Sequence, residues 1–496
     1  MQRKFLTNLL LLLFLNLLIK PFWILGIDRA VQNSIGVEDY GFYYALFNFS
    51  FLLNILLDLG ITNFNNRNIS QNNHLIKKHL SSIFSLKLSL GILYMIVSLL
   101  CAWIIGYSFK QFQFLLLLCF NQFLIYLILY LRSNIAGLFL FKTDSVVSVL
   151  DRTFMIAICA VLLWGNLTHE PMKIEWFIYV QTIAYGLTAI IAFIIVFRKA
   201  EFFKLRWNFP FSMMILKKSF PFAVLILLMT FYNRIDTVMM ERMLPDGENN
   251  IQAGIYAQAY RLLDATNMIA YLFAGLLLPL FSRMLKQKDS VEDLVKLSFR
   301  LLVIPAIMVA SGSFFYREEI MKLLYHEHAE ASAPVFGLLM GCFIPVSSSY
   351  IFGTLLTANG NLKALNIMAG GGMLLNIILN IFLIPHLQAF GSAIASFFTQ
   401  GLAALTQIII VQYIFKFKVN LRMILKFGFF AAGILTLGYI SKSVHSNWII
   451  CFAAMTGFYI LLSFVTGIIN LKSLYQIVKN GDKIPSQIQK EEFAVD

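Results

Sequence analysis

Apolar stretches of about twenty residues recur along almost the whole chain, with short polar breaks between them. An α-helix needs about 20 apolar residues to cross the hydrocarbon core of a bilayer. Helices and closed barrels are the structures that can cross it with their backbone polar groups hydrogen-bonded. The pattern therefore predicts an all-α polytopic membrane protein with about 14 transmembrane helices.

Each predicted span follows one apolar stretch and is long enough for one helix. The spans are residues 5–27, 40–63, 82–106, 112–131, 146–165, 174–197, 220–243, 254–280, 297–315, 334–358, 362–384, 389–414, 423–441 and 447–470. Arg3 and Lys4 precede the first span, as basic residues precede the apolar region of a signal peptide. Because this stretch is long and further spans follow it, we interpret it as an uncleaved signal anchor.

Composition and charge agree with this class of protein. Apolar residues make up 59% of the chain and charged residues 13%, and the mean hydropathy is +0.76, which together exclude a soluble globule. Lys and Arg gather in the loops on the side of both termini, so the positive-inside rule predicts cytoplasmic termini. The net charge of +14 then reflects topology and contact with anionic lipid headgroups. Because the basic residues are dispersed among loops, we expect no nucleic-acid partner.

The chain carries no motif for a bound cofactor. No G-x-x-x-x-G-K sequence occurs, so any uphill transport is not driven by a nucleotide bound to this chain. The five cysteines lie in apolar stretches and have no metal-ligand spacing. We therefore expect no cofactor, no metal site and no enzymatic activity.

Two halves of the chain resemble each other. The second span opens with Gly41-Phe42-Tyr43-Tyr44-Ala45 and the eighth with Gly254-Ile255-Tyr256-Ala257-Gln258. Repeats of six helices would be parallel, and such repeats commonly enclose a central substrate site. We expect an N-lobe at 1–205, a C-lobe at 206–418, two further helices at 419–470 and a cytoplasmic tail at 471–496.

Ionisable residues inside the spans are the best candidates for function, because each costs roughly 2.5–3.5 kcal/mol at a helix centre on insertion scales. Cations slightly outnumber anions among them, whereas a cavity for an organic cation should carry an excess of negative charge. The residues that we single out are Lys20, Asp58, Lys87, Arg234, Asp236, Arg261 and Asp264.

Two of these cations have alternative interpretations. Lys20 precedes Pro21, which bends a helix, and it either faces a polar cavity at this depth or snorkels to the outer interface. Arg261 and Asp264 are three residues apart and share a helix face. They form either a structural ion pair or a site where the guanidinium binds a phosphate through two hydrogen bonds.

Arg234 and Asp236 are two residues apart and point to different faces of their helix, so one can face a cavity while the other faces a neighbouring helix. Asp58 either binds a proton or sodium ion or hydrogen-bonds a neighbouring helix. Lys87 lies near the cytoplasmic end of its span, where we expect it to snorkel. Arg29, at the outer end of the first span, either meets a phosphate or anchors the helix at the interface.

Hydroxyl and amide side chains form stripes on the tenth to twelfth spans. In membranes such stripes serve helix–helix packing, or they line a wet path that suits a sugar. The stripes are Tyr350, Thr354 and Thr357, then Asn376 and Asn380, then Ser392, Ser396 and Thr399.

Short motifs occur in a fixed order between about residues 5 and 470. They are Glu38-Asp39-Tyr40-Gly41-x-Tyr43, Leu57-Asp58-Leu59-Gly60-Ile61, Arg234-x-Asp236, Gly254-x-Tyr256-x-x-Ala259-x-Arg261, Ala358-Asn359-Gly360-Asn361-x-Lys363, Asn376-x-x-x-Asn380-x-x-x-Ile384-Pro385 and Gly391-Ser392-Ala393. In this order and spacing they resemble the Wzx-type polysaccharide flippases, which handle O-antigen or capsule repeat units in the multidrug/oligosaccharidyl-lipid/polysaccharide exporter superfamily.

The resemblance implies two six-helix lobes around a cationic cavity, with two extra helices at the end. Members of that family move an undecaprenyl-diphosphate-linked oligosaccharide from the cytoplasmic to the periplasmic leaflet of the bacterial inner membrane by alternating access. On this reading the diphosphate meets Lys20, Arg29, Arg234 and Arg261. The candidates for coupling to an inward gradient of H⁺ or Na⁺ are Asp58, Asp236 and Asp264.

The partners implied by the resemblance are the lipid-linked oligosaccharide, membrane lipids, the coupling ion, and the polymerase and export machinery of lipopolysaccharide synthesis. Two alternatives from the same superfamily are a drug or organic-cation antiporter and a lipid II flippase. A membrane-embedded glycosyltransferase is a third alternative, but the longest outer loops, 244–253 and 316–333, are too short for a catalytic domain.

Overall fold

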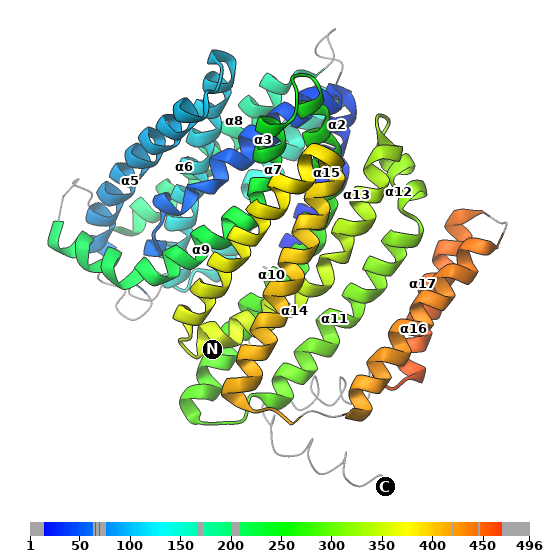
Figure 1. Cartoon of the computed structure of the whole chain (residues 1–496). Coiled ribbons are helices and arrows are strands. Elements are labelled where there is room, and N and C mark those ends of the chain that lie inside the picture. The colour runs from blue at the N-terminus through cyan, green and yellow to red at the C-terminus, as the bar shows by residue number, and fades with distance from the viewer. Residues whose placement is uncertain are drawn as a thin grey trace.

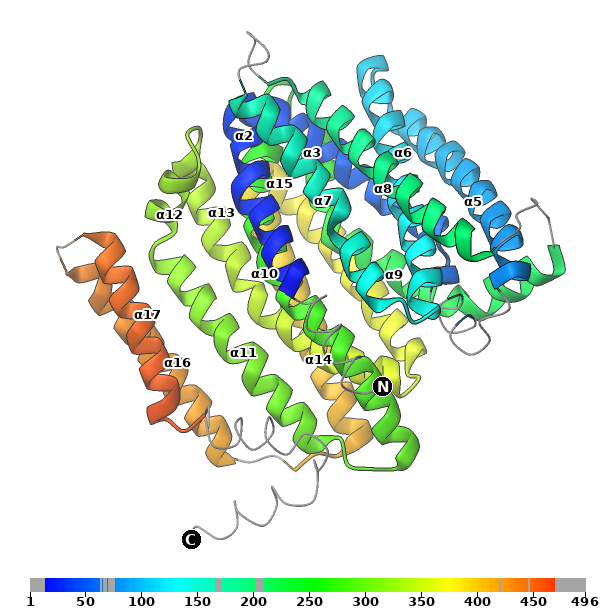
Figure 2. The same cartoon turned by 180° about the vertical axis from the view of Figure 1, so that it is seen from behind.

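The computed structural model describes residues 14–62, 65, 69, 76–165, 172–200, 209–418, 421–444 and 447–468. Within these residues all regular secondary structure is helical, and the long helices stand side by side (Figure 1 and Figure 2). The predicted all-α fold is confirmed. The predicted tail at 471–496 and the predicted boundaries at 205–206 and 418–419 fall on or next to residues outside the described ranges.

The N-lobe contains the described residues up to Ala200. Residues 14–22 are helical and continue into the π-helical turn η1 (Trp23–Asp28) and the helix α2 (Arg29–Ile35). This π turn follows Pro21, where we expected the first helix to be disturbed. The other elements are α3 (Val37–Leu52), the 3-10 turn η2 (Asn54–Leu57), α5 (Ile76–Ile105), α6 (Phe109–Gly137), α7 (Phe141–Trp164) and α8 (Ile174–Ala200).

The C-lobe and the last two helices follow. The C-lobe consists of α9 (Phe209–Met243), α10 (Glu248–Gln287), α11 (Glu292–Phe315), the short α12 (Arg317–Leu324), α13 (Ala329–Gly341), α14 (Phe343–Ala358) and α15 (Leu362–Phe415). Within α15 the backbone turns sharply at Gln388 (φ 51°, ψ −130°), so this element comprises two consecutive helices. The chain ends with α16 (Leu421–Ser443) and α17 (Trp448–Val465).

Ten helical segments among the described residues are long and apolar enough to cross a membrane, and one of them, Leu362–Phe415, covers two predicted spans. The chain is a multi-pass membrane protein. The first predicted span, 5–27, is not among these ten segments, because it begins before the described residues. The second is broken, because α3 ends at Leu52 and the chain then passes through η2 and through positive φ values at Leu59 (44°) and Gly60 (81°).

The two lobes touch through α3 of the N-lobe, which packs against α9 and α10 of the C-lobe. Glycine permits the closest approach. A Cβ atom on Gly41 would collide with the carbonyl oxygen of Asn250, and one on Gly254 with the carbonyl oxygen of Val37. These two glycines open the similar segments of the two halves, so the repeated sequence marks the place where the lobes meet.

Hydrogen bonds join the lobes at the end of the molecule that carries α2, the start of α3, α12 and the start of α13, at the top of Figure 1. Asn33 Nδ2 donates to the carbonyl oxygen of Leu324 at 2.9 Å, and the backbone N–H of His326 donates to Asn33 Oδ1 at 3.3 Å. Deeper in the same interface, Asn48 Nδ2 donates to Thr237 Oγ1 at 2.8 Å. The lobes are therefore closed at this end, which the charge distribution predicts to be the outer one.

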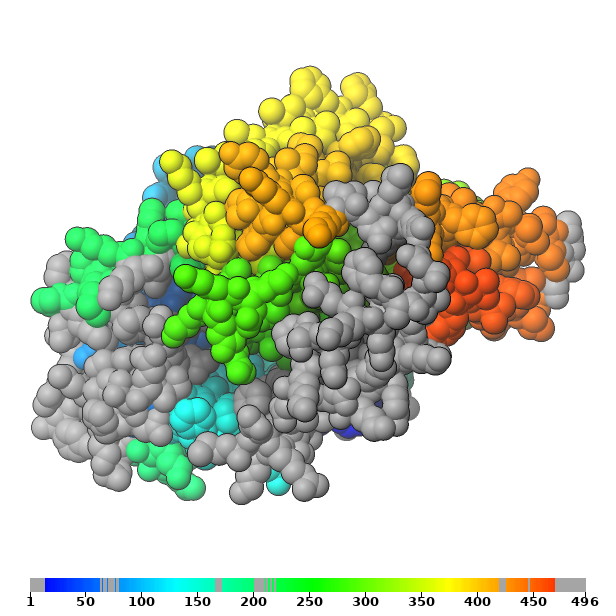
Figure 3. All heavy atoms as spheres, turned by 90° about the horizontal axis from the view of Figure 1, so that it is seen from below, coloured from blue at the N-terminus to red at the C-terminus, as the bar shows by residue number. Residues whose placement is uncertain are grey.

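The two C-terminal helices pack against the rest of the protein through α11. A small apolar core that includes Tyr316, Phe430 and Tyr459 fills this contact. Seen from the opposite end, α16 and α17 project from one flank (Figure 3). They contribute no residue to the cavity described next.

Candidate functional site

A cavity of about 350 Å³ lies between the two lobes. This volume is at the lower end of the roughly 300–1,000 Å³ of ligand pockets in proteins. The N-lobe lines it from the first helix, η1, α3, α7 and α8, and the C-lobe lines it from α9, α10 and α14. Its lining residues are Lys20, Trp23, Ile24, Tyr43, Phe47, Phe51, Arg152, Gln181, Tyr185, Arg234, Arg261, Asp264, Asn267, Met268, Tyr271, Leu272 and Tyr350.

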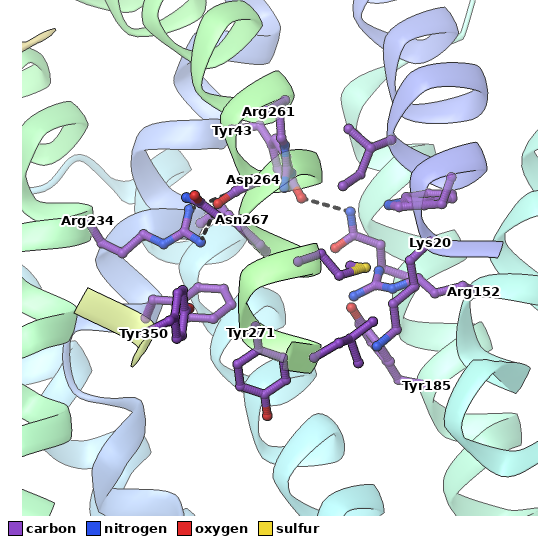
Figure 4. Close-up of a pocket in the computed structure, with 17 residues that line it drawn as sticks. Lys20, Tyr43, Arg152, Tyr185, Arg234, Arg261, Asp264, Asn267, Tyr271 and Tyr350 are labelled. Carbon is purple, nitrogen blue, oxygen red and sulfur yellow. Dashed lines mark hydrogen bonds and ion pairs between the residues drawn. The ribbon is translucent and has the colours of Figure 1, made fainter. Parts of the chain in front are cut away.

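Positive charge dominates the cavity. Lys20, Arg152, Arg234 and Arg261 reach it from four different helices, and Asp264 is the one carboxylate among the described residues that line it (Figure 4). Electrostatic interactions at such depth are stronger than at the surface, because less water screens them. The cavity therefore favours an anionic ligand.

Arg234 forms a two-pronged ion pair with Asp264. Its Nη1 and Nη2 donate to Asp264 Oδ2 and Oδ1 at 3.2 and 3.1 Å. The guanidinium also lies over the rings of Phe51 and Tyr260, with its carbon 5.5 and 5.2 Å from the ring centroids. The pairing of Asp264 with Arg261 that we considered from their spacing is therefore wrong, because Asp264 pairs with the neighbouring helix α9.

Arg261 belongs to the C-lobe, but its partners belong to the N-lobe. Its Nε lies 3.2 Å from Asp28 Oδ2 and donates to the hydroxyl of Tyr40 at 3.1 Å. The same hydroxyl donates to the Asp28 carboxylate at 3.0 Å, and the guanidinium lies over the rings of Tyr44 and Phe47. Asp28 is fully buried, so this ion pair ties the lobes together in a site with little water.

Lys20 and Arg152 lie together on the N-lobe side of the cavity (Figure 4). Lys20 is half-buried, and it has no hydrogen-bond or ion-pair partner among the described residues. Arg152 stands between the rings of Trp23 and Tyr185, at 5.7 Å from each centroid. The cavity interpretation of Lys20 is the one that fits this arrangement.

Asp58 and Lys87 form a separate buried pair within the N-lobe. Lys87 Nζ contacts Asp58 Oδ1 and donates to the carbonyl oxygen of Leu57 at 2.9 Å. The Lys87 side chain is only 2% exposed, so the prediction that it snorkels is wrong. The ammonium instead caps the broken turn after η2, and neither residue lines the cavity.

Asp236 is buried inside the C-lobe, behind the cavity wall. Its carboxylate accepts hydrogen bonds from the hydroxyls of Tyr256 and Ser396 at 2.6 Å and from Asn380 Nδ2 at 2.8 Å. Among the described residues no cation lies within ion-pair distance of it, and Asn376 Nδ2 is buried beside this cluster without an acceptor. A buried carboxylate held by neutral donors alone is costly unless a proton or a metal cation joins it.

One remaining candidate lies away from the cavity, and two residues of the site were not predicted from the sequence. Arg29 begins α2 and does not line the cavity. Arg152 was missed although it lies within the predicted span 146–165, where the rule that selected the other embedded charges also applies. Asp28 was missed because it follows the end of the predicted first span, and the structure alone shows that it reaches Arg261.

The sequence of residues 6–285 matches the model of a protein family described as "Polysaccharide biosynthesis protein". This match covers more than half of the chain. No match was found among curated proteins.

Solved structures with the same fold are membrane transporters. A lipid II flippase, MurJ, in an inward closed conformation aligns with a TM-score of 0.65 at 16% identity, over 91% of this chain and 97% of that one. An inward-facing multidrug resistance MATE family transporter of the MOP superfamily gives 0.58 at 14% identity, over 80% and 94%. A MOP superfamily transporter from Pyrococcus furiosus, whose binding pocket is described as reversed in polarity, gives 0.54 at 14% identity, over 83% and 94%.

Proposed function

The chain belongs to the polysaccharide biosynthesis protein family, and from this premise we propose that it moves an undecaprenyl-diphosphate-linked oligosaccharide from the cytoplasmic to the periplasmic leaflet. The membrane is then the bacterial inner membrane, with both termini in the cytoplasm. The observation that carries the proposal is a cavity that four cationic side chains line, between lobes that are closed at one end. A diphosphate is the part of such a substrate that these charges attract.

The candidates for binding the diphosphate divide by position. Lys20, Arg234 and Arg261 line the cavity, so they are in a position to meet a headgroup. Arg29 lies outside the lining, so any contact with the diphosphate requires the outward-facing state. Aromatic and amide side chains such as Tyr271, Asn267 and Tyr350 complete the wall, and they offer stacking surfaces and hydrogen bonds to a sugar.

Among the candidates for ion coupling, Asp236 has the surroundings that suit the role best. It has no cationic partner among the described residues, whereas Asp58 pairs with Lys87 and Asp264 with Arg234. Binding of H⁺ or Na⁺ at Asp236 would neutralise a buried charge on α9, the helix that also carries Arg234. Coupling between the gradient and the cavity would then pass through one helix.

A lipid II flippase is the second candidate, because the fold and a cationic cavity suit either lipid-linked diphosphate. A drug or organic-cation antiporter fits less well, since four cations face one carboxylate in the lining. A polymerase and export machinery are the partners expected for a flippase of surface polysaccharide.

A null mutant tests the proposed function. It should accumulate the lipid-diphosphate oligosaccharide on the cytoplasmic leaflet and lose surface polysaccharide, measured by lipid extraction and by staining of intact cells. Accumulation of lipid II together with cell lysis would identify the lipid II flippase instead. Normal surface polysaccharide together with reduced dye efflux would contradict the proposal in favour of the antiporter.

A further inference from the structure

The four cations of the cavity differ in how far their hydrogen-bonding capacity is already used. Arg234 makes two hydrogen bonds to Asp264, and Arg261 has Asp28 and Tyr40 as oxygen partners. Each of these arginines keeps further N–H donors, but a carboxylate already neutralises its positive charge, so neither adds an uncompensated charge for a phosphate.

The Tyr185 hydroxyl is a hydrogen-bond partner of Arg152, and among the described residues most of the other N–H donors of this arginine have no oxygen acceptor. Its Nη1 donates to Met155 Sδ at 3.3 Å, and a thioether is a weak acceptor. Its Nε lies 3.7 Å from Asp151 Oδ2, which is beyond hydrogen-bond distance. A guanidinium carries five N–H donors, so this side chain has unused capacity for an oxyanion.

Two aromatic rings nevertheless hold the Arg152 guanidinium in a defined position. The rings of Trp23 and Tyr185 stand on it at 5.7 Å from their centroids, and such cation–aromatic contacts hold a planar cation without using its N–H groups. Lys20, one turn before Trp23 on the first helix, extends toward the same part of the cavity (Figure 4). Two cations that lack a hydrogen-bonded carboxylate among the described residues thus lie on one wall, and both belong to the N-lobe.

We infer that Lys20 and Arg152 form the anchor for the diphosphate, one cation to each phosphate. This inference rests on the proposed function. A diphosphate diester carries one negative charge on each phosphate, and Lys20 and Arg152 are two lining cations that have no carboxylate within hydrogen-bond distance among the described residues. Arg234 and Arg261 keep their ion pairs on the C-lobe side, and Arg261 continues to join the lobes through Asp28. The headgroup is then held by the N-lobe, and the glycan extends toward the wall of Tyr271 and Tyr350.

Binding to the purified full-length protein tests this assignment. The probes are undecaprenyl diphosphate and the uncharged undecaprenol, and native mass spectrometry in detergent measures their dissociation constants. Arg152→Gln should weaken undecaprenyl diphosphate binding about tenfold to a hundredfold, the range expected for lost hydrogen bonds to a charged group. Binding of undecaprenol should not change, and Arg152→Lys should restore part of the loss because it retains the charge.

Two further variants keep the test decisive if Arg152→Gln folds poorly. Lys20→Gln removes a cation that has no partner among the described residues, so it leaves no buried group unpaired and should weaken binding similarly. Asp151→Asn removes the carboxylate nearest to Arg152 and should tighten binding. Arg132→Gln is the matched control, because Arg132 is comparably exposed but pairs with Asp144 outside the cavity, and its binding should equal that of the parent.

The outcomes separate this inference from the proposed function. Parent-like binding by Arg152→Gln and Lys20→Gln, with loss in Arg234→Gln or Arg261→Gln, would overturn the N-lobe anchor and leave the flippase proposal intact. If the parent itself binds undecaprenyl diphosphate no more tightly than undecaprenol, the flippase proposal fails as well.

Discussion

At the scale of single residues, the partners of a charged side chain decide what it can do. Lys87 and Asp58 satisfy each other inside the N-lobe, and this pair stabilises a broken helix. Asp236 is equally buried but has only neutral donors among the described residues. Sequence position does not distinguish these two aspartates, since both lie in apolar spans. Their surroundings suit Asp58 to a structural role and leave Asp236 as the residue for which we propose uptake of a cation.

We predict that Asp236→Asn abolishes the dependence of transport on the ion gradient. An amide cannot hold a proton or a metal cation as a carboxylate does, and its N–H groups would face the donors of Tyr256 and Asn380. Coupling free energies of about 1–3 kcal/mol correspond to a roughly 5- to 150-fold change. Surface polysaccharide synthesis in cells with and without an uncoupler measures the effect, and immunoblotting of membranes controls for protein level.

The double variant Asp58→Asn/Lys87→Met is the control, because it removes a buried ion pair without leaving either charge alone. It should keep the gradient dependence. Gradient dependence that persists in Asp236→Asn and disappears in the double variant would instead assign the coupling to Asp58.

At the scale of elements, the closed end depends on a helix cap supplied by the opposite lobe. α3 begins after Gly36, which has a φ of 93° and no side chain to cap the helix. The backbone N–H of Val37 donates instead to Glu327 Oε2, at 3.0 Å, from the turn between α12 and α13. A carboxylate at a helix N-terminus also interacts favourably with the helix dipole. Opening of this end must break that cap together with the bonds of Asn33.

We predict that Glu327→Gln shifts the protein toward the state that is open at this end. Loss of a cap costs about 0.5–2 kcal/mol, which corresponds to a roughly 2- to 30-fold change in the equilibrium. The reporter is Asn267→Cys in the cavity, and the measurement is its rate of reaction with a membrane-impermeant thiol reagent added from the periplasmic side.

Glu330→Gln is the matched control, because Glu330 lies in the same region and pairs with Lys322 within the C-lobe. Its reaction rate should equal that of the reporter alone. Equal rates for Glu327→Gln and Glu330→Gln would exclude the cap as part of the closure.

At the scale of the whole molecule, the hydrogen bonds and ion pairs that join the lobes among the described residues lie on one side of the cavity. Among the described residues, every hydrogen bond or ion pair between the lobes comes from residues 28–48 or 105–111 of the N-lobe. These segments lie from the predicted outer end down to the level of Arg261. In an alternating-access transporter such an arrangement leaves the cavity to be reached from the other side.

We predict that Asn267→Cys reacts with the impermeant reagent from the cytoplasmic side at least about tenfold faster than from the periplasmic side, because the closed end blocks the latter. Inverted and right-side-out vesicles provide the two orientations, and the parent chain corrects for its native cysteines. Equal rates in both orientations would contradict the inference that the cavity is reached from the cytoplasmic side.

Hydropathy predicted the all-α class, because burial in a bilayer demands long apolar helices, and the similarity of the segments that begin at Gly41 and Gly254 predicted the two lobes. That the lobes meet at these two glycines was decided by the tertiary structure. Hydropathy and spacing also selected Lys20, Arg234 and Arg261, since charge at membrane depth is too costly to be incidental. The pairing of these charges was decided by the tertiary structure. Asp28 and Arg261 are 233 positions apart, and the distances that join such residues depend on how the helices pack, which helical periodicity along one segment does not contain.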